Sequence, residues 1–327
     1  MPAFEDFEGQ SAHIAQLRSD FERGAFVHAY LFAGPAGTGK RSVARLCAMT
    51  ALCRGEKKPC GVCGPCRRVL AGTHPDVHTV VPEREKKKIG VDVLRAAIEE
   101  VGTRSFEDGV KVMLFPDAEQ MTEAAQNCLL KTLEEPPAGT VFFLMTDQPG
   151  ALLPTIVSRC RVIRFHPLSQ EQAEARLRAL GLSAQDASRR ARMAEGCVGQ
   201  ALAIDEEQLA LRRTLTADVF SVHSMADVPA VVNRYKEDRD RQTLVMDVLE
   251  CAVRDILIAQ SGAAPLEGAG YAPEAEAYAR AVPMEGGLAL SGQVTQARKM
   301  LGSNVAFASA LETVLLKVSE EYAKWRW

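Results

Sequence analysis

The amino-acid sequence predicts a protein that joins an α/β domain to all-α domains. Up to Phe165, short apolar runs alternate with segments of helical periodicity, and a glycine-rich turn follows one of these runs. Alternating strands and helices form a parallel sheet covered on both faces. Beyond Phe165 strand signals are nearly absent. We therefore predict an α/β domain with a parallel sheet over residues 1–166, a small helical domain over 167–205 and a larger helical domain over 206–327.

The overall composition is that of a soluble globular protein. Of the 327 residues, 47% are apolar and 25% charged, and the net charge is −3. That charge argues against a protein that holds DNA mainly through its own surface, which needs clustered Lys and Arg. The start of the chain, MPAFEDFEGQ, lacks the pattern of an export signal, and no apolar run approaches the length of a membrane span. We expect a cytoplasmic location.

The stretch HAYLFAGPAGTGKRS has the order strand, glycine-rich loop, helix. The apolar run Ala29–Ala33 predicts the strand. The loop that follows predicts a phosphate cradle, because its backbone N–H groups and the helix N-terminus can face one anion while a lysine reaches the outer phosphates. An ordinary glycine turn before a helix is the alternative. The candidate nucleotide ligands are Gly34, Gly37, Thr38, Gly39 and Lys40.

The magnesium position of this loop is altered. A P-loop carries Ser or Thr directly after the lysine, so that a hydroxyl can bind Mg²⁺. Here that residue is Arg41. Ser42 does not simply replace the hydroxyl, because one helical step rotates a side chain by about 100°. The sequence therefore predicts the scaffold of a nucleotide site with a damaged metal position.

Four cysteines fall within fourteen residues, and the last three form two overlapping C-x-x-C pairs. Thiolates at this spacing can surround a tetrahedral ion at about 2.3 Å, and Zn²⁺ fits such a site best. A redox C-x-x-C pair and an iron–sulfur cluster are the alternatives. A four-thiolate site would be structural. The predicted ligands are Cys53, Cys60, Cys63 and Cys66, and the cysteines expected to take no part are Cys47, Cys128, Cys160, Cys197 and Cys251.

Two further buried strands are predicted at Val112–Phe115 and Val141–Met145. Asp117 follows the first of them, where P-loop ATPases hold Mg²⁺. The next residue in those enzymes is usually a glutamate that activates water, but here it is Ala118. Ligands bind at the carboxyl ends of parallel strands, so we expect Asp117 to lie beside the glycine-rich loop.

Taken together, these motifs resemble the clamp-loader branch of the AAA+ family. The resemblance is carried by HAYLFAGPAGTGK, the cysteine cluster, THPDV, DAEQMTEAAQNCLLKTLEEPP and TIVSRC, and it covers the first 165 residues with specific motifs. The helical remainder matches more loosely in order and length. The resemblance implies an AAA+ P-loop domain with an inserted zinc module at residues 53–66, a helical lid and a helical collar.

The resemblance also implies roles for individual residues. The gamma/tau subunits of this family are its working ATPases, and three of their features are lost here, at Arg41, Ala118 and Gly199, which stands where they carry a nucleotide-sensing arginine. The SRC motif is retained, and in the family its arginine, here Arg159, reaches a neighbouring subunit's ATP. The resemblance implies a stator that binds ATP or ADP, if at all, without hydrolysis. Its partners would be gamma/tau and delta subunits, with the sliding clamp and primed DNA met through the complex of a DNA-directed DNA polymerase.

Two readings from other classes remain open. The chain would be an active clamp-loader ATPase of the gamma/tau type if Ser42 or Glu119 compensates for the missing groups. It would be a zinc-knuckle nucleic-acid-binding protein if the isolated chain binds DNA in a salt-sensitive way.

Overall fold

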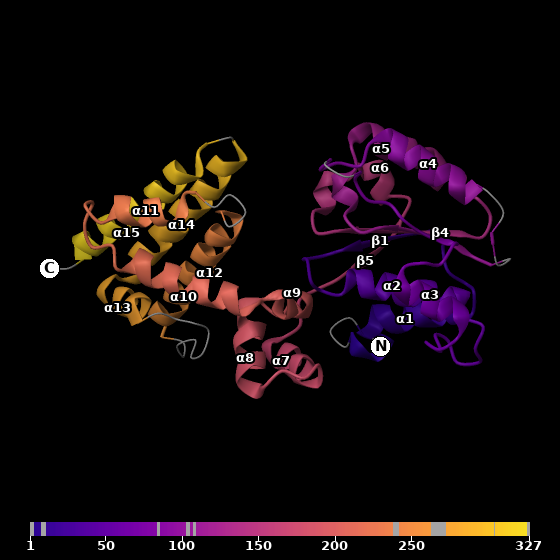
Figure 1. Cartoon of the computed structure of the whole chain (residues 1–327), viewed down its shortest axis with the longest axis horizontal. Helices are drawn as coiled ribbons and strands as arrows, with labels where there is room; N and C mark the ends of the chain where they lie inside the picture. Colours follow the sequence, from indigo (N-terminus) through magenta and orange to yellow (C-terminus); the bar gives the residue numbers. More distant parts are fainter. Residues whose placement is uncertain are drawn as a thin grey trace. The chain divides into compact units, whose positions relative to one another are not determined.

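A computed structural model of the chain describes residues 3–7, 11–83, 86–102, 105–106, 109–237, 242–262, 273–303 and 305–325. The chain folds as two compact units (Figure 1). The first comprises Met1–Leu182 and Ala194–Ala201, and the second comprises Ser183–Met193 and Leu202–Trp327. The division into three domains at residues 166 and 205 stays a prediction.

The first unit is built on a five-stranded sheet in the order β2-β3-β4-β1-β5. All neighbouring strands pair in parallel, which confirms the predicted fold class. Every residue of β1 and β4 is buried, as expected for central strands covered on both faces. The strands are β1 (Ala29–Ala33), β2 (Val77–Thr79), β3 (Lys111–Phe115), β4 (Thr140–Thr146) and β5 (Arg161–Arg164).

Helices cover both faces of this sheet (Figure 1). Tyr30 and Phe32 of β1 pack into one core with α1 (Ser11–Glu22), α2 (Lys40–Leu52) and α3 (Gly64–Ala71). Ala29 and Leu31 point the other way, because side chains alternate along a strand. They join the core formed with α4 (Val91–Gly102), α5 (Glu123–Glu134) and α6 (Pro154–Val157). The first unit also contains α7 (Gln170–Ala179).

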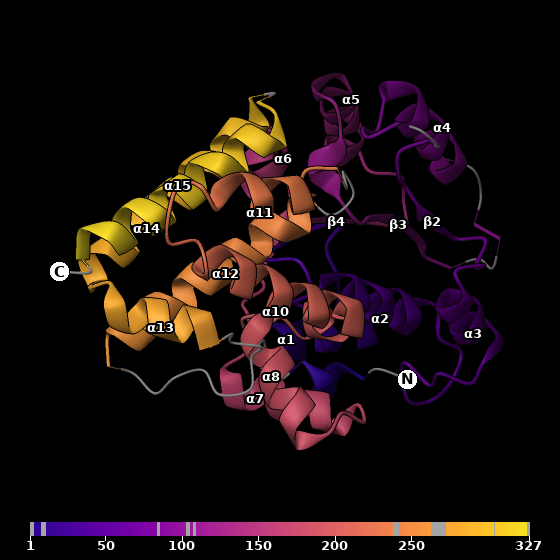
Figure 2. The same ribbon diagram turned by 60° about the vertical axis from the view of Figure 1, so that its left-hand side comes forward.

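The second unit is helical in all its described elements (Figure 2). One apolar core joins α10 to α15, and Arg212 and Asp255 form an ion pair of 2.8 Å that is almost fully buried. No helix among the described residues is long and apolar enough to span a bilayer. The helices of the second unit are α8 (Ala184–Met193), α10 (Glu206–Phe220), α11 (Val228–Tyr235), α12 (Gln242–Gln260), α13 (Pro273–Ala281), α14 (Met284–Gly302) and α15 (Phe307–Trp325). The helix α9 (Val198–Ala203) begins in the first unit and ends in the second.

Candidate functional sites

The glycine-rich loop lies between the carboxyl end of β1 and the first turn of α2. Gly37 and Gly39 have φ angles of 78° and 96°, in the left-handed region that side chains disfavour, so the loop can take this path only with glycine at both positions. The five candidate nucleotide ligands are thus gathered at one edge of the sheet.

Lys40 is turned back onto its own loop. Its Nζ donates hydrogen bonds to the carbonyl oxygens of Gly34 and Pro35, the second at 2.8 Å. The residue is only 8% exposed, and burial lowers the pKa of the Lys40 ammonium. Two of the three ammonium donors are therefore used inside the loop.

The magnesium position is occupied by an ion pair. Nη2 of Arg41 lies 2.7 Å from each carboxylate oxygen of Asp117, which directly follows β3. Asp117 does lie beside the glycine-rich loop, but its carboxylate is already neutralised by a guanidinium. Because one nitrogen of Arg41 already donates to both carboxylate oxygens, a metal ion would have to compete with the guanidinium for Asp117.

Residues 196–201, which we call the lid segment, pack directly on the glycine-rich loop within the first unit. The N–H of Gly199 donates to the carbonyl oxygen of Gly37 at 2.9 Å. Gly199 is the second residue of α9, and N–H groups in a helix's first turn have no partner within the helix. A Cβ at Gly199 would lie 2.9 Å from the Gly37 Cα, and one at Gly37 would lie 2.6 Å from the Gln200 nitrogen. Only glycine fits at either position.

This close packing predicts that Gly199→Ala is destabilising. The added methyl must push the lid segment away from Gly37, and overpacking of this kind costs about 1–3 kcal/mol. We expect a lower Tm and faster amide hydrogen exchange at residues 196–201. Gly150→Ala is the matched control, because a Cβ there has no atom within 4 Å. An unchanged Tm and unchanged exchange in Gly199→Ala would contradict the closed arrangement.

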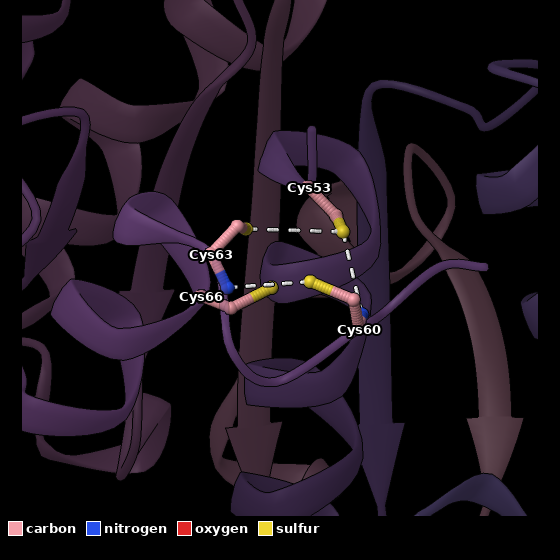
Figure 3. A group of neighbouring side chains, drawn as sticks. All are labelled: Cys53, Cys60, Cys63 and Cys66. Carbon is pink, nitrogen blue, oxygen red and sulfur yellow. Dashed lines mark hydrogen bonds between the residues drawn. The ribbon is translucent and has the colours of Figure 1, made fainter. Parts of the chain in front are cut away.

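The four clustered cysteines point toward one centre (Figure 3). Their Sγ atoms all lie within 4.8 Å of one another, and those of Cys53 and Cys63 are 4.0 Å apart. Four sulfurs at about 2.3 Å from a tetrahedral ion would be about 3.8 Å apart, so this cluster can hold a metal ion. Among the described residues, none of the other five cysteines belongs to such a group.

The backbone around the cluster favours thiolates. The N–H groups of Gly55 and Cys60 each lie 3.3 Å from the Cys53 sulfur, and the N–H of Cys63 lies 3.4 Å from the Cys60 sulfur. Hydrogen bonds from the backbone N–H groups of Cys63 and Val62 lower the pKa of the Cys60 thiol to about 6, whereas burial raises the pKa of Cys66. Metal binding would have to remove the proton from Cys66.

Arg159 lies in the turn between α6 and the start of β5. Its Nη1 donates to the carbonyl oxygen of Thr155 at 2.9 Å, and its Nη2 lies 2.5 Å from the carboxylate of Glu134. The side chain is 34% exposed. Because β1 and β5 are parallel, the start of β5 and the carboxyl end of β1 lie at opposite edges of the sheet. Arg159 is therefore remote from the chain's own glycine-rich loop.

The sequence reasoning missed three partners in these sites. It did not identify Glu134 beside Arg159, the pairing of Arg41 with Asp117, or the contact of Gly199 with Gly37. The one available signal for Glu134 is its position, since an acid at the carboxyl end of a helix opposes the helix dipole.

The matching family model and three similar proteins all represent subunits of DNA polymerase III. The family described as "DNA polymerase III, delta subunit" matches residues 9–169. The DNA polymerase III subunit delta′ of Bacillus subtilis is 33% identical over 258 residues, which cover 75% of this chain and 76% of that protein. The Escherichia coli subunit delta′ is 39% identical over 198 residues, covering 58% and 59%. The Escherichia coli subunit tau is 33% identical over 222 residues, covering 63% of this chain but 33% of that protein.

Proposed function

Because this chain belongs to the family of the DNA polymerase III subunit delta′, a clamp-loader subunit, we propose that it serves the loader as a stator. Its own nucleotide site is idle, and its arginine completes the ATP site of a neighbouring subunit. In this role it helps to load the sliding clamp onto primed DNA, in the cytoplasm. The gamma/tau and delta subunits are its direct partners, and the clamp and DNA are reached through the complex.

The proposal of an idle nucleotide site is supported mainly by the contacts that already occupy the glycine-rich loop. Gly37 is covered by Gly199, the Lys40 ammonium is engaged by backbone oxygens, and Asp117 is paired with Arg41. A nucleotide could enter only if these contacts opened. Even then, Arg41 offers no lone pair to Mg²⁺ and Ala118 offers no base, so ATP or ADP would bind without hydrolysis.

The isolated chain is expected to hydrolyse ATP no faster than background. The Lys40→Ala variant should show the same rate, because Lys40 takes no part in ATP hydrolysis by this chain. The measurement is steady-state ATPase of the purified chain and of this variant, with and without Mg²⁺. The rival reading, an active ATPase of the gamma/tau type, has one observation in its favour, because Oε2 of Glu119 is buried and has no hydrogen-bond partner among the described residues. A rate above background that Lys40→Ala abolishes would establish that reading instead.

Arg159 is proposed to act in trans on the γ-phosphate of an adjoining subunit's ATP. Two points support this. Its position at the start of β5 removes it from the chain's own loop, and its guanidinium is partly exposed. A guanidinium suits phosphate oxygens because its donors form a rigid fork.

Zn²⁺ is proposed as the occupant of the cysteine cluster, held by Cys53, Cys60, Cys63 and Cys66. Four thiolates form a closed tetrahedral set, which suits a structural ion and leaves no position for a substrate. The ion would tie the end of α2, where Cys53 lies, to the start of α3, where Cys63 and Cys66 lie. A zinc-knuckle nucleic-acid-binding protein is the remaining alternative, and salt-sensitive DNA binding by the isolated chain would favour it.

Residues 206–327 are proposed to form the collar that holds the subunits together. Two large apolar side chains one turn apart on α14, Met284 and Leu288, are 43% and 58% exposed. An exposed apolar pair of this kind suits an interface between subunits.

The Leu288→Glu variant is therefore expected to weaken assembly with gamma/tau and delta subunits by about tenfold or more, since it places a charge in the proposed interface. The measurement is the concentration dependence of complex formation on a sizing column. Met225→Glu is the control, because Met225 is 74% exposed in the same unit but lies outside α14. Equal assembly by Leu288→Glu and the unsubstituted chain would argue against this surface.

A further inference from the structure

Glu134 holds the guanidinium of Arg159 in one orientation. The carboxylate accepts from Nη2 at 2.5 Å, while the carbonyl oxygen of Thr155 accepts from Nη1 at 2.9 Å. Two contacts on different nitrogens fix the plane of the guanidinium as well as its position. An arginine has five N–H donors, so three remain available for a phosphate.

Helix stability does not explain why an acidic residue stands at position 134. It is the last residue of α5, and Glu135 caps the same end. Acidic groups there oppose the helix dipole, and Pro136 and Pro137 then stop the helix. Glu135 has no side-chain partner among the described residues, whereas Glu134 pairs with Arg159. The pairing gives Glu134 a role that its neighbour lacks.

Hydrogen bonds and a shared core join α5, which carries Glu134, to the segment that carries Arg159. Gln126 of α5 is 5% exposed, its Nε2 donates to the carbonyl oxygen of Ala151 at 3.1 Å, and its Oε1 accepts from the N–H of Leu153 at 2.8 Å. These bonds lock the first turn of α5 to the chain entering α6. On the other side, Cys160 is 9% exposed and packs in the core that α5 and α6 share. Glu134 and Arg159 thus belong to elements that share hydrogen bonds and a buried core.

We infer that Glu134 is a positioning residue for Arg159, holding its free N–H donors ready for a neighbouring subunit's phosphate. This inference rests on the proposed function of Arg159. Glu134 itself touches no phosphate. Without Glu134, the guanidinium keeps only the Thr155 contact and samples other rotamers. The rotamer that faces the neighbouring subunit's phosphate is then populated for a smaller fraction of the time.

The test uses the assembled loader with gamma/tau and delta subunits, and measures DNA- and clamp-stimulated ATPase at varied ATP. Glu134→Ala should lower the rate of the site that Arg159 serves by about threefold to tenfold, because orientation matters most in the transition state. The total kcat should therefore fall by most of the loss that Arg159→Ala causes, and KM for ATP should be unchanged. Glu134→Gln should recover much of the rate, since its amide oxygen can still accept from Nη2. Glu135→Ala, a matched loss of one charge at the same helix end, should have no effect.

The Arg159→Ala background separates this inference from the function on which it rests. Adding Glu134→Ala to Arg159→Ala should cause no further loss, because the residue acts only through the arginine. If Arg159→Ala lowers the rate but Glu134→Ala does not, the positioning role is wrong and the arginine's role stands. An equal loss from Glu134→Ala with and without Arg159 would also overturn it. If Arg159→Ala has no effect, both proposals fail.

Discussion

Arg159→Ala is expected to remove turnover at the ATP site that this chain is proposed to complete. An arginine finger contributes about 10³–10⁵ in rate where it is the main one, because it neutralises charge that develops on the transferred phosphoryl group. In a loader with several ATP sites, total ATPase should fall only by this site's share. Clamp loading needs the whole cycle and should fall by about tenfold or more. The measurement is stimulated ATPase and clamp loading by the reconstituted complex.

Arg164→Ala is the control for this prediction. Arg164 lies at the other end of β5 and is exposed, so its loss removes the same charge without touching the proposed site. The Arg159→Ala chain should still assemble and keep its metal content. Its Tm should stay within about 4 °C, because an exposed ion pair such as Arg159–Glu134 adds at most about 1 kcal/mol. Normal ATPase and normal clamp loading with Arg159→Ala would remove the assignment.

Loss of the proposed zinc should have the second large effect. We expect one Zn²⁺ per chain by elemental analysis, and none after Cys66→Ser. Apparent binding energies of structural zinc reach about 10–16 kcal/mol in small zinc-finger peptides. Here α2 and α3 also pack in the apolar core, so the chain should stay folded with a clearly lower Tm. Chelation of the unsubstituted chain should lower Tm in the same way.

Cys47→Ser distinguishes loss of the metal from loss of packing. Cys47 is fully buried in the same core but lies outside the cluster. This variant should lose stability and yet keep one zinc per chain. A metal-free unsubstituted chain, or equal zinc content in Cys66→Ser, would show that the four sulfurs do not hold zinc.

The fold was predictable because its central strands, β1, β3 and β4, are short and buried on both faces. Such strands read as continuous apolar runs bounded by turn residues. The expected runs at Ala29–Ala33, Val112–Phe115 and Val141–Met145 correspond to β1, β3 and β4. The cysteine cluster was predictable for a similar reason, since its ligands are close in sequence and their spacing alone limits the geometry.

The state of the nucleotide site was not predictable in the same way. Arg41 and Asp117 are 76 residues apart, and Gly37 meets Gly199 because the lid segment packs on the glycine-rich loop within the first unit. The resemblance implies that Gly199 stands where the gamma/tau ATPases carry a nucleotide-sensing arginine. It does not show that the missing side chain lets two backbones come within hydrogen-bond distance. Likewise, Glu134 looks like any acid on a helix until its contact with Arg159 is seen.

The central claim is that this subunit supplies an arginine to a neighbour while its own nucleotide site is idle. The most direct test compares stimulated ATPase of the reconstituted loader containing Lys40→Ala, Arg159→Ala or the unsubstituted chain. Lys40→Ala is expected to leave the rate unchanged, because the Lys40 ammonium donates hydrogen bonds to its own loop, and Arg159→Ala is expected to lower it. A fall with Lys40→Ala and none with Arg159→Ala would show that the chain's own nucleotide site is used and that Arg159 serves no neighbour.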